Sequence, residues 1–276
     1  MLYEAEREAA VEAATKAAAI IRRRVGRLDS SEISEKGRND LVTAVDFEAQ
    51  ETIYGVLGAA FSEYAFLGEE DEPGKLRDPD RDQWIIDPVD GTTNFVHGLP
   101  PYSVSIALQR DRAVVVGVVL EVGHDELFEA VRGQGARVNG KWMKVSAVSV
   151  PQKAMLATGF PSRDYTTPYL SEYLQVLGQT MQHWQSVRRM GSAAADLAYV
   201  ACGRFDGFFE IGLSPWDAAA GSLLIQEAGG TVTDFSGRPD FLYRPQVLAT
   251  NGALHARLME VVAPLREIGV KGAVSR

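Results

Sequence analysis

The spacing of apolar residues in the N-terminal part of the chain predicts two helices. Across residues 3–25, Ala and Ile recur every three or four positions, the pattern of a helix with one apolar face. A second helix is expected at about 46–60, and Asp46 is a natural N-cap for it. The polar segment between them, residues 30–38, contains Lys36 and is expected to be a mobile loop.

The next part of the chain alternates in the manner of strands. A short apolar run at 83–86 predicts a buried strand, and Asp87-Pro88 should end it because proline cannot donate to a strand ladder. Further strands are expected at 104–108, 113–121 and 127–131, and Asn139-Gly140 is a hairpin turn signal. We therefore expect residues 82–146 to form an antiparallel meander that follows the two helices, an α+β arrangement.

Strand and helix patterns alternate in the C-terminal part, which favours an α/β arrangement. A boundary is expected near Val150-Pro151, which gives subdomains 1–150 and 151–276. The expected strands lie at 154–158, 187–190, 205–211, 231–234 and 247–250. The expected helices lie at 169–182, after an N-cap at Ser192, after Pro215, and at 253–265.

Composition narrows the function classes. The chain has 276 residues, 46% of them hydrophobic, and a formal net charge of -9 without a basic block beyond residues 22–24. This balance argues against a nucleic-acid surface as the main function. The single cysteine, Cys202, excludes an internal disulfide and fits a reducing compartment. The N-terminus lacks a signal-peptide core, and the longest apolar run, 113–120, is too short to span a bilayer, so we expect a cytoplasmic protein without membrane contact.

The candidate functional residues are concentrated directly after the predicted strand at 83–86. Asp87 and Asp90 stand three residues apart, Gly91 follows, and Thr92 begins what looks like the first turn of a helix. The free N–H groups of a helix start attract anions. Divalent cations such as Mg²⁺ prefer oxygen ligands and commonly share them with phosphate. This combination predicts a site where cations lie between the two carboxylates and a phosphate group.

Four more acidic residues occupy strand ends or helix starts. Taken singly, Asp46 has an ordinary interpretation as an N-cap, and Asp217 as a carboxylate at a helix N-terminus that the helix dipole favours. Glu69 and Glu70 would ordinarily be a solvated acidic loop. A two-metal site needs about four or five oxygen ligands from separate segments. The two aspartates after the strand therefore make these other acids candidate ligands as well.

Two long motifs resemble the inositol monophosphatase family. They are WIIDPVDGTTNF at 84–95, with HGLP at 97–100, and WDAAAGSLLIQEAGG at 216–230. DLVTAVD at 40–46, GEE at 68–70 and the segment 191–210 fit the same family, so the resemblance covers nearly the whole chain. It implies a five-layer αβαβα sandwich with two mixed sheets, a homodimer, and a lithium-sensitive Mg²⁺-dependent phosphatase.

The resemblance also implies metal ligands, with two or three Mg²⁺ ions in each subunit. Glu69, Asp87 and the carbonyl of Val89 would bind the first ion. Asp87, Asp90 and Asp217 would bind the second. A third, weaker ion and its waters would lie near Glu69 and its neighbour in the sequence, Glu70.

The same resemblance implies how the substrate is held. The backbone of Gly91 and Thr92 would bind the phosphate, and the Thr92 hydroxyl, oriented by Asp46, would help to position or activate the attacking water. Lys36 would lie in the loop that covers the site. The alcohol part of the substrate would face Ser192, Ala193, Glu210 and Asp217.

We therefore expect hydrolysis of inositol monophosphate, with myo-inositol 1-phosphate as the example. A fructose-1,6-bisphosphatase or a broad sugar phosphatase on the same scaffold is the near alternative. Relatives that cleave 3'-phosphoadenosine phosphates tend to carry Lys where this chain has Thr93, and haloacid-dehalogenase-type phosphatases use D-x-D-x-T rather than D-x-x-D-G-T. An alternative of another class is a dimeric binding module for a macromolecular partner. Arg188 and Arg189 could be a surface pair, or could orient the acids or touch substrate from a neighbouring subunit.

Overall fold

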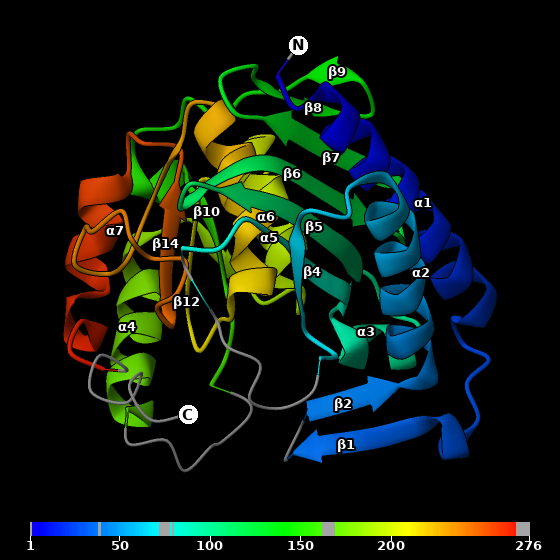
Figure 1. Cartoon of the computed structure of the whole chain (residues 1–276). Helices are drawn as coiled ribbons and strands as arrows, with labels where there is room; N and C mark the ends of the chain where they lie inside the picture. Colours follow the sequence, from blue (N-terminus) through cyan, green and yellow to red (C-terminus); the bar gives the residue numbers. More distant parts are fainter. Residues whose placement is uncertain (1, 38–39, 72–77, 79, 162–168, 269–276) are drawn as a thin grey trace.

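The computed structural model describes residues 2–37, 40–71, 78, 80–161 and 169–268. Two β-sheets lie face to face with a pair of helices between them, and further helices cover the outer face of each sheet (Figure 1). The layers therefore alternate as αβαβα, as expected from the resemblance. Among the helices in the described part of the chain, none is long and apolar enough to cross a membrane.

The first layer consists of α1 (Glu4–Arg24) and α2 (Ala44–Ala60), which lie side by side on the larger sheet (Figure 1). Their buried faces are built largely from small side chains, including Ala13 and Ala17 of α1 and Ala49 of α2. Small residues let two helix backbones approach closely, so the helices pack both on each other and on the sheet.

The segment expected to be a loop at 30–38 is instead mostly regular, so that prediction is wrong. A short 3₁₀ turn, η1 (Ser30–Glu32), leads into β1 (Ile33–Gly37), which pairs antiparallel with β2 (Asp40–Thr43). A hairpin that lies outside the main sheets can keep polar side chains in solvent, so its strands lack the apolar pattern of a core strand. The backbone of Lys36 lies in β1, and its side chain is outside what the structure describes.

The larger sheet contains seven strands in the order of the sequence. These are β3 (Ala65–Gly68), β4 (Gln83–Asp90), β5 (Ser103–Arg110), β6 (Ala113–Glu121), β7 (Glu126–Val131), β8 (Ala136–Val138) and β9 (Lys141–Trp142). β3 runs parallel to β4, and every later pair is antiparallel, which confirms the predicted meander. Asn139 and Gly140 link β8 to β9 with φ of 47° and 75°, as a tight hairpin turn of this type requires.

The smaller sheet is mixed and has the strand order β11-β10-β12-β14-β13. Its strands are β10 (Met155–Thr158), β11 (Ser186–Arg188), β12 (Gly207–Ile211), β13 (Thr231–Thr233) and β14 (Gln246–Thr250). Helices α5 (Ala193–Ala201) and α6 (Pro215–Glu227) lie between the sheets, and α4 (Leu170–His183) and α7 (His255–Val261) cover the outer face (Figure 1). The helix expected at 253–265 is shorter because η3 (Ala263–Leu265) contains Pro264, which cannot continue a helix.

The alternation of side chains along each strand produces separate cores on the two faces of a sheet. On β4, Trp84 and Ile86 pack against the layer of α1 and α2, whereas Ile85 belongs to the core around α5 and α6. On β12, Phe208 joins that central core and Phe209 joins the outer core under α4 and α7. Every side chain on the inner face of β4 is thereby directed toward α5 and α6.

Candidate active site

The strand that carries two of the acids is longer than expected. β4 continues to Asp90, past Pro88, so the prediction that Asp87-Pro88 ends it is wrong. Asp87 pairs with Ser105 and Asp90 with Ser103, so three steps on β4 match two on β5 and one residue is extra. Such a bulge leaves a residue out of the ladder, which is how a strand accommodates proline.

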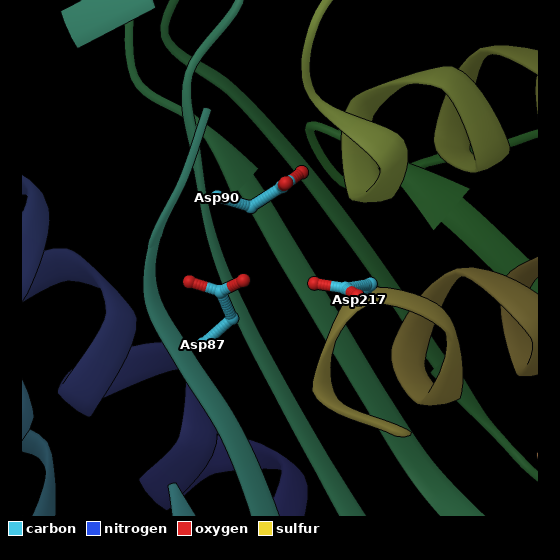
Figure 2. A group of neighbouring side chains, drawn as sticks. All are labelled: Asp87, Asp90 and Asp217. Atoms are coloured by element: carbon cyan, nitrogen blue, oxygen red, sulfur yellow. The ribbon is translucent and has the colours of Figure 1, made fainter. Parts of the chain in front are cut away.

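The bulge also changes where the second aspartate points. In a regular strand, residues three apart lie on opposite faces. One extra residue restores the same face: Asp87 faces Asp217 at the start of α6, and Asp90 points toward the start of α5 (Figure 2). With Asp217 they form a group in which one carboxylate oxygen of each residue lies within 4.8 Å of the others.

Asp217 reaches this group from the first turn of α6. Ser214 is the N-cap of the helix, and its backbone N–H donates to Asp217 Oδ2 over 2.6 Å. Oδ2 of Asp217 therefore takes part in the capping box, which fixes the orientation of the side chain. In this orientation the carboxylate lies close to Asp87 and Asp90 of β4. The Ser105 hydroxyl donates to the Trp216 carbonyl over 3.0 Å and ties the start of α6 to β5.

Burial and mutual repulsion disfavour the ionised state of both aspartates of β4 and so raise their pKa values. Burial, followed by the charges of Glu69, Asp90 and Asp217, raises the pKa of Asp87 well above its usual value. Burial raises the pKa of Asp90 to about 6, although hydrogen bonds from Ser192 and from the backbone of Ala194 lower it. Each of these buried carboxylates makes ionisation of the others less favourable, and a bound cation would offset that repulsion. Because their ligand atoms are all oxygens, the group suits a hard divalent cation.

Glu69 and Glu70 follow β3 and point to different neighbours. The Glu69 N–H donates to the Ile86 carbonyl over 3.1 Å, and the Glu69 carboxylate raises the pKa of Asp87. Glu69 is nevertheless outside the three-acid group defined by the 4.8 Å limit. The charge of Glu70 instead acts on Asp46, whose pKa it helps to raise.

Asp46 has a different place in its helix from the one expected. The N-cap of α2 is Thr43, and Asp46 is the third helical residue of a capping box, so the N-cap assignment is wrong. Asp46 Oδ2 accepts from the Thr43 N–H over 2.9 Å and from its hydroxyl over 2.5 Å. Its Oδ1 lies 3.1 Å from Thr92 Oγ1, which is also 3.0 Å from the Val89 carbonyl oxygen.

Gly91 brings its backbone close to a second segment of the chain. Its φ is 93°, and a Cβ there would lie 3.0 Å from the Gly191 carbonyl oxygen and 3.3 Å from Ser192 Cβ. Both conditions favour glycine. The following helix, α3 (Thr92–Val96), is held to the same segment by Asn94, whose side-chain amide donates to the Met190 carbonyl over 2.8 Å.

The residues expected to face the alcohol part of the substrate lie on the C-terminal side of the site. Ser192 is buried, and its hydroxyl donates to Asp90 Oδ2 over 2.5 Å. Ala193 begins α5 and is 8% exposed. Glu210 lies on β12 and is half-buried. The structure therefore connects Ser192 directly to one of the three acids.

Sequence reasoning missed the residues that support the Glu69-Glu70 segment. Gln50 Oε1 accepts from the Glu70 N–H over 3.0 Å, and Asp71 Oδ2 accepts from the Gly68 N–H over 2.7 Å. The Tyr54 hydroxyl donates to Asp71 Oδ1 over 2.7 Å. Gln50 and Tyr54 lie four and eight residues after Asp46 on α2, a spacing that places all three on one helix face.

The sequence left open the role of Arg189 and did not single out Asp196. The Arg189 guanidinium lies 5.8 Å from the centre of the Phe160 ring. Asp196 on α5 is 2% exposed, and no partner for its Oδ1 occurs within the described residues. Burial, followed by the charges of Glu210 and Asp90, raises the pKa of Asp196 well above its usual value, while Arg189 lowers it.

Comparison with known proteins connects this arrangement to one family. The sequence model of the inositol monophosphatase family matches residues 3–267. A Nus factor SuhB from Pseudomonas aeruginosa is 42% identical over 259 residues, covering 92% of this chain and 94% of the relative. An inositol-1-monophosphatase from Mesorhizobium japonicum is 41% identical over 255 residues, covering 91% and 94%.

Solved structures agree in fold. The extragenic suppressor protein SuhB from Bartonella henselae has a TM-score of 0.86 at 39% identity, covering 92% of this chain and 97% of that protein. The inositol monophosphatase from Anabaena has a TM-score of 0.83 at 37% identity, covering 95% and 97%. Comparison by sequence and comparison by structure therefore both lead to SuhB and inositol monophosphatase proteins.

Proposed function

The chain belongs to the inositol monophosphatase family, and on this premise we propose that it hydrolyses inositol monophosphate to inositol and phosphate with Mg²⁺ as cofactor. The observation that carries the proposal is the group of Asp87, Asp90 and Asp217, whose carboxylate oxygens approach within 4.8 Å. Three buried or half-buried acids at this separation are unfavourable without a counter-charge. Divalent cations and the phosphate they bind would supply it.

The described residues divide into two proposed ligand sets that share Asp87. Glu69, Asp87 and the Val89 carbonyl would hold one ion, and Asp87, Asp90 and Asp217 the other, with Glu70 and Glu69 close to a third. When bound, the ions would neutralise phosphate charge, lower the pKa of bound water and stabilise the leaving alkoxide. Ser192 and Ala194 support this set because their hydrogen bonds keep one oxygen of Asp90 fixed.

Thr92, oriented by Asp46, would help to position or activate the attacking water. The Thr92 hydroxyl lies within hydrogen-bond distance of Asp46 Oδ1, at 3.1 Å. If it donates there, its oxygen can accept a hydrogen bond from a water molecule and orient that water for attack on phosphorus. The backbone N–H groups of Gly91 and Thr92, at the start of α3, would hold the non-bridging phosphate oxygens.

The substrate alcohol would lie between α5, β12 and the start of α6. Glu210, Ser192, Ala193 and Asp217 would border this space, and Lys36 is proposed as a further contact. A carboxylate such as Glu210 accepts hydrogen bonds from hydroxyl groups, which suits a polyol. Fructose 1,6-bisphosphate and other sugar phosphates share that chemistry, so a panel of phosphate esters would rank inositol monophosphate against them.

The proposal is tested by replacing Asp90 with Asn, which keeps the size of the side chain and removes its charge. We expect kcat/KM for myo-inositol 1-phosphate to fall by about 1000-fold, because the metal contributes several kcal/mol of transition-state stabilisation. Asp125→Asn is the matched control, since Asp125 is an exposed aspartate paired with Arg22. An Asp90→Asn enzyme with near-normal turnover would refute the proposal.

Further properties of the family extend the proposal. We expect a homodimer, inhibition by lithium and a cytoplasmic location, and we expect residues 1–150 and 151–276 to act as two subdomains that share one site. Size-exclusion chromatography with light scattering measures the first property. Phosphate release in the presence of LiCl measures the second, and a monomeric or lithium-insensitive enzyme would contradict the respective expectation.

A second candidate function is suggested by the name Nus factor, which relatives such as that of Pseudomonas aeruginosa carry. Because that name does not denote a phosphatase, we also consider this chain as a dimeric binding module for a macromolecular partner. Affinity capture with the native protein and with Asp90→Asn separates the two roles. A specific partner retained equally by both would support binding that is independent of hydrolysis, whereas the absence of a specific partner would contradict this second role.

A further inference from the structure

The carboxylate of Glu210 lies directly against the backbone of Gly159. Gly159 follows the last residue of β10, and β10 runs parallel to β12, with Thr158 opposite Phe209. Gly159 is therefore the next position opposite Glu210. A Cβ on Gly159 would lie 1.8 Å from Glu210 Oε1 and 1.9 Å from its carboxyl carbon, so the carboxylate occupies the space that any side chain here would need.

We propose that Gly159 is a specificity-determining position, because its missing side chain sets where Glu210 meets the alcohol part of the substrate. This inference rests on the proposed function. The substrate class it selects is a phosphate ester of a polyol, whose hydroxyl groups donate to the Glu210 carboxylate. The residue acts through Glu210 and does not itself need to touch the phosphate.

Buried hydrogen bonds fix the backbone under the carboxylate. The hydroxyl of Tyr173, on α4, donates to the Gly159 carbonyl over 2.5 Å. The hydroxyl of Thr158 donates to the Phe209 carbonyl over 2.8 Å, which joins β10 to β12 beside Glu210. Tyr173 is 4% exposed and Thr158 1% exposed, so water does not compete for these bonds. The backbone position of Gly159 beneath the Glu210 carboxylate is thus fixed.

The crowding at Gly159 concerns Glu210 more than the stability of the fold. The atoms in the way are the end of a flexible side chain, which can rotate aside. At Gly117, in contrast, a Cβ would lie 2.8 Å from the Ala220 carbonyl oxygen, a backbone atom that cannot yield without moving a helix. Gly159→Ala should therefore fold and displace the carboxylate, which separates specificity from stability.

The test compares two esters in the Mg²⁺-loaded enzyme. One is myo-inositol 1-phosphate, and the other is p-nitrophenyl phosphate, whose leaving group has no hydroxyl. We expect Gly159→Ala to lower the ratio of their kcat/KM values by about 10- to 100-fold, the range for hydrogen bonds to a charged group. Turnover of p-nitrophenyl phosphate should stay unchanged. Gly178→Ala is the control, since a Cβ at Gly178 has no neighbour within 4 Å.

A double-mutant cycle makes the test specific to Glu210. In a Glu210→Ala background, Gly159→Ala has no carboxylate to displace and should have no further effect on the ratio. Tyr173→Phe, which removes the bond to the Gly159 carbonyl, should lower the ratio by a smaller factor. It serves as the second variant should Gly159→Ala lose its cooperative thermal unfolding.

The outcomes separate this inference from the function on which it rests. An unchanged ratio in Gly159→Ala, or an equal loss with and without Glu210, overturns the inference and leaves the proposed phosphatase intact. A native enzyme that hydrolyses neither ester overturns the proposed function, and the inference with it.

Discussion

Asp87 is 1% exposed and shares its surroundings with the carboxylates of Glu69, Asp90 and Asp217. A structural aspartate in such a position would ordinarily have a cationic partner. The Val89 N–H donates to Asp87 Oδ1 over 3.0 Å, and another hydrogen-bond partner of the Asp87 carboxyl group is Glu69, itself an acid. The side chain is therefore placed for a function that needs concentrated negative charge, at a cost in stability when no cation is bound.

This cost can be measured with Asp87→Asn. Asn keeps an oxygen that can accept from the Val89 N–H and removes the repelled charge. In metal-free protein at pH 7 we expect the free energy of unfolding to rise by about 1–2 kcal/mol, while phosphatase activity is lost. Urea denaturation in EDTA measures the first quantity. A metal-free variant clearly less stable than the native protein would contradict this assignment of the repulsion.

The second residue-scale prediction concerns Asp46 and pH. Burial, partly offset by hydrogen bonds from Thr43, raises the pKa of Asp46 to about 6 from the ordinary value of 3.8. Between these values the folded protein binds the proton more tightly than the unfolded chain does, so stability falls as pH rises. The stabilisation that protonated Asp46 contributes to the folded state is fully present below about pH 4 and is lost as pH rises through about 6.

We therefore expect the stability difference between the native protein and Asp46→Asn to depend on pH. In EDTA, the free energy of unfolding of the native protein minus that of the variant should decrease by on the order of 3 kcal/mol between pH 4 and pH 7. Urea titrations of both proteins at a series of pH values give this difference directly. A difference that increases with pH would mean that the folded state favours the ionised form of Asp46.

Residues were predictable from the sequence where a motif fixes both residue type and place. Asp87, Asp90 and Asp217, which the structure brings together, were all anticipated, the first two from the D-x-x-D-G-T motif and the third from its place at a helix start. Their support was less visible: Gln50 and Asp71 lie in segments where polar residues normally face solvent. Whether such a residue bonds to the site depends on tertiary contacts that spacing alone does not specify.

At the scale of elements, the irregular parts of β4 and α2 define the site. The bulge in β4 places Asp87 and Asp90 on one face, and the capping box of α2 turns Asp46 toward Thr92. Both features were misassigned from the sequence, as a strand end and as a simple N-cap. Proline usually does end a strand, and only pairing with β5 shows that the chain continues through Pro88 in an extended form.

The capping box predicts a joint effect on stability and activity. Thr43→Ala removes the hydroxyl that accepts from the Val45 N–H over 3.2 Å and donates to Asp46. We expect a loss of about 1 kcal/mol in stability and a decrease of about 10-fold in kcat, because Asp46 loses its orientation toward Thr92.

Thr43→Ser is the matched variant, since it keeps the hydroxyl and loses only a methyl group. It should restore both quantities nearly to the native values, as judged by urea unfolding and by steady-state phosphate release. If Thr43→Ala lost stability but kept its full kcat, Asp46 would have no part in positioning Thr92.

For the whole molecule, the αβαβα arrangement explains how distant segments meet. The meander and the alternation of strands and helices could be predicted, because apolar periodicity follows directly from burial. The strand order of the smaller sheet could not, because it depends on which edges pair. The layer of α5 and α6 between the sheets brings Asp217 against β4 (Figure 2). A site formed between layers in this way requires the complete fold.

The central claim is that Asp87, Asp90 and Asp217 together bind a divalent cation. Its most direct test is a crystal structure of the protein with Mn²⁺, a substitute for Mg²⁺ whose position anomalous scattering reveals. We predict an anomalous peak bounded by the three carboxylates, about 2.0–2.4 Å from an oxygen of each. A structure that binds Mn²⁺ only elsewhere, or leaves this position without a peak at saturating Mn²⁺, would contradict the account.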